Sequence, residues 1–345
     1  MTNNEKDNEK DNEKNNEKDN EKDNEKGETD VLKRFHIISQ AFMNEITILY
    51  HDFIQQPAEP EATHKLRVKI RQLRSVLSFI RPLLDKEDYI ELQNQLKKLA
   101  LCFAHLRELD VLLEELKIME KTHPEAIVSR HQLEAILGNM RQKEQKKLCK
   151  KIIKQDMEKS IFILAQKLND EFKPKQGDSS TKPEKKHSYE KYIRINFRKW
   201  MKKAEETRQQ LNNQATPLLK QREDVHGLRI KYKKLRYMEE ILKTDIIKKP
   251  ELLKKPELLK KLETGVKVKT VDTSDILNLK AIQDGLGLIC DLPNNLKILK
   301  KIMKTNDNQE LSYECGLLAG YQIMEADLWK KQIFQENTTV TISSK

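Results

Sequence analysis

Glycine and aromatic side chains are scarce in this sequence. Its 345 residues include only 9 glycines, and 6% of the residues are aromatic. Leu, Ile, Lys, Glu and Gln are common instead, and these residue types favour helix over sheet. We therefore expect an all-α protein whose core consists mostly of Leu and Ile.

Cysteine is also rare, and its spacing argues against a metal site. No two cysteines form a CxxC pair, which is the usual signature of a structural zinc site. We interpret them as reduced thiols of a cytosolic protein, because they lie in apolar or helical segments. They are Cys102, Cys149, Cys290 and Cys315. The sequence thus predicts neither a metal nor a cofactor.

Long apolar runs are missing too. The sequence has no stretch of 18 or more apolar residues, and its first residues lack the apolar region of a signal peptide. We therefore expect a cytoplasmic protein that does not enter a membrane.

The sequence also lacks the common catalytic motifs. It contains no GxxxxGK[ST] phosphate-binding loop, no GxSxG and no HExxH. The best acidic candidates for holding a catalytic metal are Asp110, Asp284 and Asp291. We interpret these aspartates as helix caps or as partners that orient basic side chains such as Arg107 and Lys280. The sequence therefore predicts a binding protein rather than an enzyme.

Positive charge is abundant but unevenly distributed. The whole chain carries a net charge of +11, whereas residues 1–30 contain 12 acidic and 6 basic residues, so residues 31–345 carry +17. A surplus of this size points to an anionic partner such as nucleic acid, acidic lipid or a phosphate polymer.

Several segments are typical of tails and linkers. Residues 1–30 repeat Asn, Glu, Lys and Asp with almost no apolar side chain, so we expect a disordered acidic tail. Residues 173–188 read as a linker. Residues 243–274 contain a tandem Lys-Lys-Pro-Glu-Leu-Leu repeat and are interpreted as an insertion, and residues 337–345 as a C-terminal tail. The rest of the chain then forms two helical halves, residues 31–172 and residues 189–336.

Apolar residues recur at helical spacing through both halves, and prolines bound several of the periodic segments. The expected helices cover residues 31–56, 63–80, 88–120 with or without a break, 125–147, 151–172, 189–211, 225–242, 276–289, 293–304 and 310–336. Both halves thus repeat one plan, in which a long helix is followed by a turn, a basic helix and further helices.

The basic helix of each half carries the same row of cationic side chains. A histidine is followed by basic residues three, seven and ten positions later. On a helix, where each residue advances by about 100°, these offsets fall within an arc of about 80° and form one stripe. The first row is His64, Arg67, Arg71 and Arg74, and the second row is His226, Arg229, Lys233 and Arg236, with Lys234 beside it.

Each row suits a linear polyanion. Its side chains follow one another at about 4.5 to 6 Å along the helix axis, and arginine can hold phosphate oxygens with two parallel hydrogen bonds. We expect both histidines in the first turn of their helices, where unpaired backbone N–H groups also attract anions. Basic residues at helical spacing usually form a solvated face, but the recurrence of the row in both halves favours a binding function.

An apolar stripe runs beside each row. In the first helix it comprises Leu66, Ile70, Leu73 and Leu77, and in the second it comprises Leu228, Tyr232 and Leu235. Glu239 interrupts the second stripe, so we expect Met238 and Ile241 to take over the packing there.

The two rows resemble the signature helices of the CHAD family, the conserved-histidine α-helical domain. The segments that carry this resemblance are His64-x-x-Arg67-Val68-x-x-Arg71-x-Leu73-Arg74 and His226-x-Leu228-Arg229-Ile230-x-x-Lys233-Lys234-Leu235-Arg236. Residues 106–112 and 279–292 are similar to two further characteristic stretches of the family. The resemblance covers about residues 31 to 329.

This resemblance implies two pseudo-symmetric four-helix bundles with a shared basic central pore or groove that binds inorganic polyphosphate. It also implies a location in the cytoplasm at polyphosphate granules, and no catalysis, because the Glu-x-Glu-x-Lys motif of the family's triphosphate-tunnel domain is missing. The ligand residues carried over are His64, Arg67, Arg71, Arg74, His226, Arg229, Lys233, Lys234 and Arg236, with Lys97, Arg107 and Lys280 as weaker candidates.

Three positions depart from the family pattern. Gln72 stands where a third basic residue is usual, Ala104 replaces a usual glycine, and Glu108 replaces a usual aspartate. The basic row itself is retained.

Two other functions fit the charge of the chain. A nucleic-acid-binding protein would normally interleave aromatic side chains with its basic residues to stack on bases, but the second row is accompanied only by Tyr232 and Tyr237. Nucleic acid is therefore the less favoured ligand. A helical scaffold for protein partners, in which the two rows are incidental, is the remaining alternative, and the sequence identifies no such partner.

Overall fold

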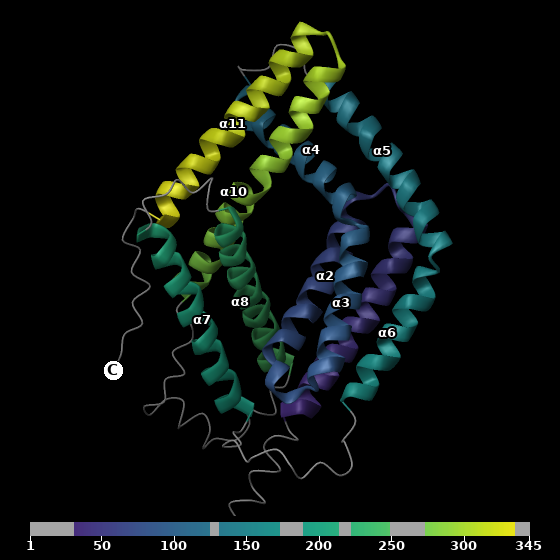
Figure 1. Ribbon diagram of the computed structural model, residues 1–345, viewed down its shortest axis with the longest axis vertical. Helices are drawn as coiled ribbons and strands as arrows, with labels where there is room; N and C mark the ends of the chain where they lie inside the picture. Colours follow the sequence, from purple (N-terminus) through teal and green to yellow (C-terminus); the bar gives the residue numbers. More distant parts are fainter. Residues whose placement is uncertain (1–30, 125–130, 173–188, 214–221, 249–272, 335–345) are drawn as a thin grey trace, which may run out of the picture.

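The computed structural model describes residues 31–124, 131–172, 189–213, 222–248 and 273–334, and all regular structure in these residues is helical (Figure 1). A helix over residues 31–55 comes first. It is followed by α2 (Pro60–Phe79), a short 3₁₀ helix η1 (Arg81–Leu83), α3 (Lys86–Cys102), α4 (Ala104–Thr122), α5 (His131–Lys154), α6 (Met157–Glu171), α7 (Tyr189–Asn213), α8 (Arg222–Lys248), α10 (Thr273–Thr305) and α11 (Gln309–Phe334). The all-α prediction is confirmed.

Several predicted segments fall outside the described residues. The tail over residues 1–30, the linker over 173–188 and the C-terminal tail over 337–345 all do. Of the predicted insertion, residues 249–272 lie outside, whereas residues 243–248 continue α8.

One helix boundary differs from the sequence-based expectation in a way that affects the site. Pro293 was expected to separate two helices, but α10 runs through it without ending. A proline inside a helix removes one backbone hydrogen bond, here the bond to the carbonyl of Ile289. Burial of Leu292, Asn295 and Leu299 on both sides of the proline keeps the segment packed. In the first half, by contrast, the corresponding stretch is broken at Phe103 between α3 and α4.

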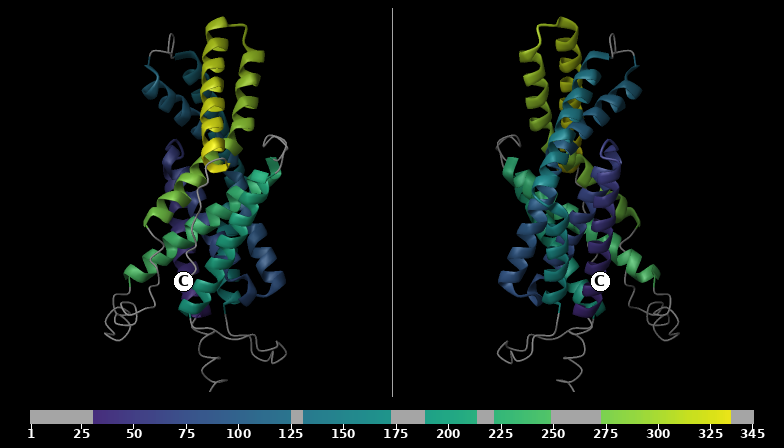
Figure 2. Two further views of the ribbon diagram at one scale, coloured as in Figure 1. Left: turned by 90° about the vertical axis from the view of Figure 1, so that its left-hand side faces the viewer. Right: turned by 90° about the vertical axis from the view of Figure 1, so that its right-hand side faces the viewer.

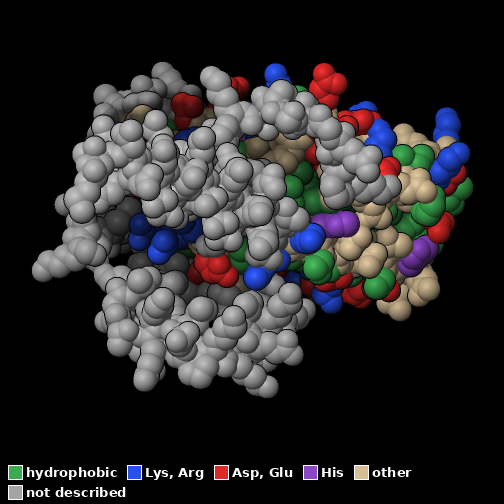
Figure 3. Space-filling model, turned by 90° about the horizontal axis from the view of Figure 1, so that it is seen from below, with side chains coloured by type: hydrophobic (Ala, Val, Ile, Leu, Met, Phe, Trp, Pro, Cys, Tyr) green, Lys and Arg blue, Asp and Glu red, His purple; other side chains and the backbone are tan. Residues whose placement is uncertain are grey.

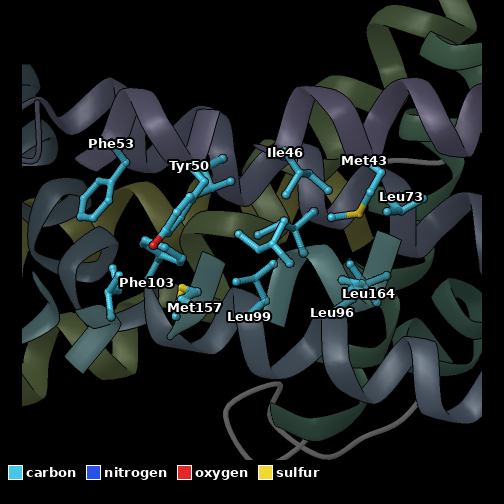
Figure 4. Close-up of a cluster of buried hydrophobic side chains, with 14 of the residues drawn as sticks. Met43, Ile46, Tyr50, Phe53, Leu73, Leu96, Leu99, Phe103, Met157 and Leu164 are labelled. Atoms are coloured by element: carbon cyan, nitrogen blue, oxygen red, sulfur yellow. The ribbon is translucent and has the colours of Figure 1, made fainter. Parts of the chain in front are cut away.

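Two hydrophobic clusters form within single halves of the chain. The first joins the helix over residues 31–55 to α2, α3, α5 and α6 through Met43, Ile46, Tyr50, Phe53, Leu73, Leu96, Leu99, Phe103, Met157 and Leu164 (Figure 4). The second joins α7, α8, α10 and α11, with Leu228, Tyr232, Leu235, Leu279 and Leu286 among its buried members. The first apolar stripe is buried as predicted, and so are Met238 and Ile241 beyond the second.

Two further clusters join the halves. One packs α4 and α5 against the C-terminal part of α10 and the N-terminal part of α11, with Leu112, Leu137, Leu299 and Leu318 fully or almost fully buried. It lies at the top of Figure 1, where the side views also bring these helices together (Figure 2). The other packs residues 31–55 and the end of α2 against α7 and α8. The two halves thus share a hydrophobic cluster at each end of the molecule.

The end of α2 is tied firmly to α7. The Phe79 ring packs edge-to-face on Trp200 with centroids 5.1 Å apart, and the hydroxyl of Tyr192 donates to the Phe79 carbonyl at 3.1 Å. Val76 and Met238 are buried in the same cluster. These contacts set the position of α2 relative to α8, which carries the second basic row. Within the described residues no helix is both long and apolar enough to cross a membrane.

Candidate anion-binding site

The fold brings the two basic rows together, because α2 and α8 pack against each other. Figure 1 shows the two helices approaching each other in the lower half of the molecule. A hydrogen bond from Gln72 Nε2 to Glu240 Oε2, 3.3 Å long, joins them directly. Each helix buries its apolar stripe in its own half, so the rows beside the stripes face the space that both halves border.

Arg71 and Lys233 form the centre of the site. Burial and the charges of Arg229 and Arg71 lower the pKa of the Lys233 ammonium to about 7. The Nε atom of Arg71 is buried and has no hydrogen-bond partner. Neither side chain forms an ion pair with a described carboxylate. Two cations from different halves therefore lie near each other, and Asp291 acts on Lys233 only through its charge.

Arg74 and Lys234 form a second pair across the helices. Burial, followed by the charge of Arg74, lowers the pKa of Lys234, and burial also lowers the pKa of Arg74. Arg74 Nε donates to Gln93 Oε1 at 3.0 Å, and the Lys234 ammonium lies 5.7 Å from the ring centroid of Trp200. This pair is thus held by neutral partners.

His64 and Arg67 extend the first row. Arg67 Nη1 donates to the backbone carbonyl of Ala100 at 2.5 Å, and its buried Nε has no partner. Burial and the charge of Arg71 lower the pKa of Arg67 to about 10. The Nδ1 atom of His64 is buried without a partner, and burial together with the charge of Arg107 lowers the pKa of this histidine. Arg107 is therefore close to the row, although its Nη2 contacts Glu114 at 3.3 Å.

Arg229 differs from the other row members because it has a carboxylate partner. Its Nη1 and Nη2 atoms donate to the two carboxylate oxygens of Asp291 at 2.7 and 2.8 Å. Burial acts to lower the pKa of Arg229, but the charge and hydrogen bonds of Asp291 outweigh it, and the pKa is raised. A Cβ atom at Gly287 would lie 3.5 Å from Nη2, so the guanidinium lies flat against the backbone of α10.

Arg236 is also engaged by carboxylates. Its Nε donates to Glu240 Oε1 at 2.8 Å, and Nη1 lies 3.9 Å from Asp284 Oδ1. The remaining candidates lie at the periphery. His226, Lys97 and Lys280 are exposed, and the two lysines come from α3 and α10.

The sequence placed one feature of the rows incorrectly. Because α2 begins at Pro60 and α8 at Arg222, both His64 and His226 lie one turn inside their helices rather than in the first turn. Their backbone N–H groups are therefore not the unpaired ones of a helix start. Asp110 does orient a basic side chain, but its partner is Arg141, with which it forms a buried pair at 2.5 Å.

Some contributors to the site were not predicted at all. These are the Ala100 carbonyl and Gln93, which accept hydrogen bonds from Arg67 and Arg74. Tyr237, which the sequence places beside the second row, influences both Arg67 and Arg229 electrostatically. Asp291 had been recognised as an orienting aspartate, but Arg229 had not been recognised as its partner. Because these contacts join distant parts of the chain, helical periodicity along the sequence carries no signal for them.

Seen from below, blue Lys and Arg side chains lie next to red Asp and Glu side chains over the part of this face that belongs to described residues (Figure 3). Among the described residues, moreover, no group of three or more His, Cys, Asp or Glu side chains is arranged to hold a metal ion.

Comparisons with known proteins agree with the resemblance of the two rows. Residues 47–293 match the family model described as the CHAD domain. The fold is similar to that of PptA from Streptomyces chartreusis, with a TM-score of 0.59 and 14% identity over 89% of this chain and 99% of that one. It is also similar to the crystal structure of the CHAD domain from the plant Ricinus communis, with a TM-score of 0.60 and 17% identity over 88% and 91% of the two chains. No curated protein matches the sequence.

Proposed function

The chain belongs to the CHAD domain family, a family associated with polyphosphate binding, and on this premise we propose that it binds inorganic polyphosphate between its two basic rows. In this proposal the halves 31–172 and 189–336 border a shared central pore or groove, and the protein acts by binding rather than by catalysis. It would hold the polymer for other proteins or attach to granules of it.

The observation that carries the proposal is the pair formed by Arg71 and Lys233. Burying a cation that has no ion-pair partner is costly, and here two partly buried cations from different helices are close enough for the charge of Arg71 to lower the pKa of Lys233. Buried nitrogen atoms of His64, Arg67 and Arg229 also lack acceptors. A bound polyanion would supply both negative charge and acceptor oxygens, which would offset these costs.

The shape of the rows favours a polymer over a single phosphate. Successive cations on one helix are about 4.5 to 6 Å apart along the axis, which suits closely spaced phosphate groups. Basic side chains of both α2 and α8 then act on the same polyphosphate molecule. Such a site is expected to lose affinity steeply as the salt concentration rises, because every phosphate that it neutralises releases counter-ions.

The aromatic side chains near the rows argue against nucleic acid as the preferred ligand. Tyr232 and Tyr237 are only 2% and 3% exposed, so neither presents a ring face on which a base could stack. The ring of Trp200 lies against the Lys234 ammonium and the Phe79 ring. A backbone of phosphates without bases is therefore the better match.

The proposal can be tested by titrating the full chain with long-chain polyphosphate, single-stranded DNA and double-stranded DNA at physiological salt. We expect polyphosphate to bind most tightly, and Arg71→Ala/Lys233→Ala to weaken its binding by more than about tenfold, since each charge-assisted hydrogen bond contributes about 1.5 to 3 kcal/mol.

A matched control removes the same two charges elsewhere. Arg198 on α7 and Lys300 on α10 are exposed, so Arg198→Ala/Lys300→Ala changes the net charge equally without touching the rows. Equal losses in both double variants, or equal affinity for all three polyanions, would mean that diffuse positive charge accounts for binding.

A further inference from the structure

The pairing of Arg229 with Asp291 points to a carboxylate that regulates the site. Resting on the proposed function, we propose that Asp291 is an internal counter-ion that occupies the anion position of Arg229 and is displaced when polyphosphate binds. The carboxylate then limits the affinity of the site, because the polymer has to replace an existing charge-assisted contact.

The geometry shows that Asp291 holds the part of Arg229 that a phosphate would use. Both Nη atoms donate to the carboxylate, at 2.7 and 2.8 Å, in the bidentate arrangement that guanidinium groups also form with phosphate. The Nε atom is buried and has no partner. The Arg229 side chain is 15% exposed, whereas that of Asp291 is 40% exposed. An anion arriving from solvent therefore meets the carboxylate before the guanidinium.

In the first half the equivalent carboxylate acts on its arginine only through its charge, without a hydrogen bond between the two. Aligning Leu96-Lys97 with Leu279-Lys280 places Glu108 at the position of Asp291, and Arg67 stands at the position of Arg229 in its row. Yet Glu108 contacts His105 at 3.1 Å, and Arg67 donates to the carbonyl of Ala100. Both halves thus carry the same row of cations, but only in the second half is the arginine three residues after the histidine hydrogen-bonded to a carboxylate.

Gly287 in the second half does not explain why only Arg229 is hydrogen-bonded to a carboxylate. A methyl group at Gly287 would meet Arg229 Nη2 at 3.5 Å, which is an ordinary contact, so Ala104 in the first half would not by itself prevent such a pair. Two features separate the halves: the aligned carboxylate is Asp291 in one and Glu108 in the other, and Asp291 lies within the unbroken α10 whereas Glu108 follows the break at Phe103.

An internal counter-ion has a signature that a purely structural residue lacks. If Asp291→Asn removes the charge, Arg229 is left buried without compensation, and the folded state is weakened. The same uncompensated arginine gains more from a bound phosphate, so affinity rises while the melting temperature of the free protein falls. A residue that only holds Arg229 in position would lose both stability and affinity.

The experiment compares Asp291→Asn with Glu108→Gln. Both variants remove one negative charge beside a row, so the general field changes equally. We expect the dissociation constant for polyphosphate to fall at least about threefold in Asp291→Asn and by less than about twofold in Glu108→Gln, because only the first releases a paired arginine. Melting temperatures are measured on the same samples without ligand.

Weaker or unchanged binding by folded Asp291→Asn, or the same gain in both variants, overturns the inference. Failure of the wild-type chain to bind polyphosphate overturns the proposed function instead, so the two outcomes are distinguishable. A second readout leaves Asp291 intact: the side-chain Nε–Hε NMR signal of Arg229, assigned by its loss in Arg229→Lys, should shift when polyphosphate is added. A signal that does not move at saturation would mean that the pair persists in the complex.

Discussion

Arg71 on α2 and Lys233 on α8 come from different halves of the chain, and the charge of Arg71 is one of the factors that hold the pKa of Lys233 near 7. Each residue lies on the basic face of its helix, and neither forms an ion pair with a described carboxylate.

Polyphosphate affinity should fall as pH rises through neutrality. Burial, Arg229 and Arg71 lower the pKa of Lys233 to about 7, while Asp291 and Cys290 oppose them. A bound polyanion favours the charged ammonium, so the pKa is higher in the complex and binding takes up a proton above pH 7. We expect the dissociation constant to rise by up to about fivefold between pH 7 and pH 8, because the charged fraction of a group with a pKa of about 7 falls from about one half to about one tenth over this range. Calorimetry in buffers of different ionisation enthalpy measures the proton uptake directly.

Lys233→Arg serves as the comparison for this pH dependence. Arginine remains charged over the whole range, so the variant should bind with nearly constant affinity from pH 7 to pH 8. A pH dependence that survives in Lys233→Arg would point to another group. His64 is such a group, and its pKa is lowered by burial and by the charge of Arg107.

Replacing Lys233 by Met should stabilise the free protein while weakening binding. The pKa of Lys233 is about 7 in the folded chain, below its ordinary value of 10.5, so the unfolded chain binds more protons between these pH values. The free energy of unfolding of the wild type therefore rises with pH in this window, and the cost of burying the charge is largest below pH 7. At pH 6 we expect Lys233→Met to raise the free energy of unfolding by roughly 1 to 3 kcal/mol. Urea unfolding at pH 6 and pH 9 measures the free energies of unfolding of wild type and variant. If the difference between the two proteins were the same at both pH values, the prediction would be contradicted.

The buried pair between Asp110 and Arg141 should be essential for stability. Asp110 is 4% exposed, and burial already raises its pKa although Arg141 opposes the shift. Arg141→Met removes that opposition and leaves a buried carboxylate, so we expect a loss of about 3 kcal/mol at pH 7. Because the pKa in the folded variant lies above that of the unfolded chain, the loss should shrink as pH falls toward 5.

Thermal unfolding at pH 5 and pH 7 follows this prediction. Lys143→Met on the exposed side of the same helix provides the control, and it should leave stability nearly unchanged at both pH values. A loss in Arg141→Met that does not depend on pH would indicate that packing, rather than the charge of Asp110, is responsible.

Replacing Gly285 and Gly227 by alanine should change the free energy of unfolding in opposite directions. At Gly285 a Cβ atom would lie 2.4 Å from Cε3 of Trp329, so α10 and α11 would have to separate, and Gly285→Ala should cost about 2 kcal/mol. At Gly227 a Cβ atom meets nothing within 4 Å, and Gly227→Ala in α8 should gain about 0.5 to 1 kcal/mol. Urea unfolding of both variants measures the two changes in the free energy of unfolding. Equal changes would contradict the packing of Trp329 on α10.

The basic rows could be predicted from the sequence because they depend on local geometry alone. Once α2 and α8 are helical, a period of 3.6 residues places Arg67, Arg71 and Arg74 on one stripe and buries Leu66 and Ile70 beside it. The same reasoning correctly predicted that Met238 and Ile241 are buried, but they pack in the cluster with Phe35 rather than with the second stripe, and Glu239 is buried as well.

The pairing of Arg229 with Asp291 could not be predicted in this way. It depends on α10 continuing through Pro293, which local rules treat as the start of a new helix. Tertiary packing outweighs the lost backbone hydrogen bond, and the uninterrupted helix carries Asp291 to the side of α8. The contacts between Arg71 and Lys233 and between Arg74 and Lys234 depend on packing between the halves, for which a helical period carries no information.

The two clusters that join the halves also bear on whether the chain must be continuous. Because Leu112 and Leu318 share one of them and Phe35 and Met238 share the other, each half alone would expose apolar surface at both of its ends. A chain cut between residues 172 and 189 should therefore remain together as a non-covalent pair of fragments, and fragments expressed separately should find each other in solution. Since α2 and α8 would belong to different fragments, the two basic rows would come together only when the fragments associate. Affinity for polyphosphate would then report how completely the fragments have associated.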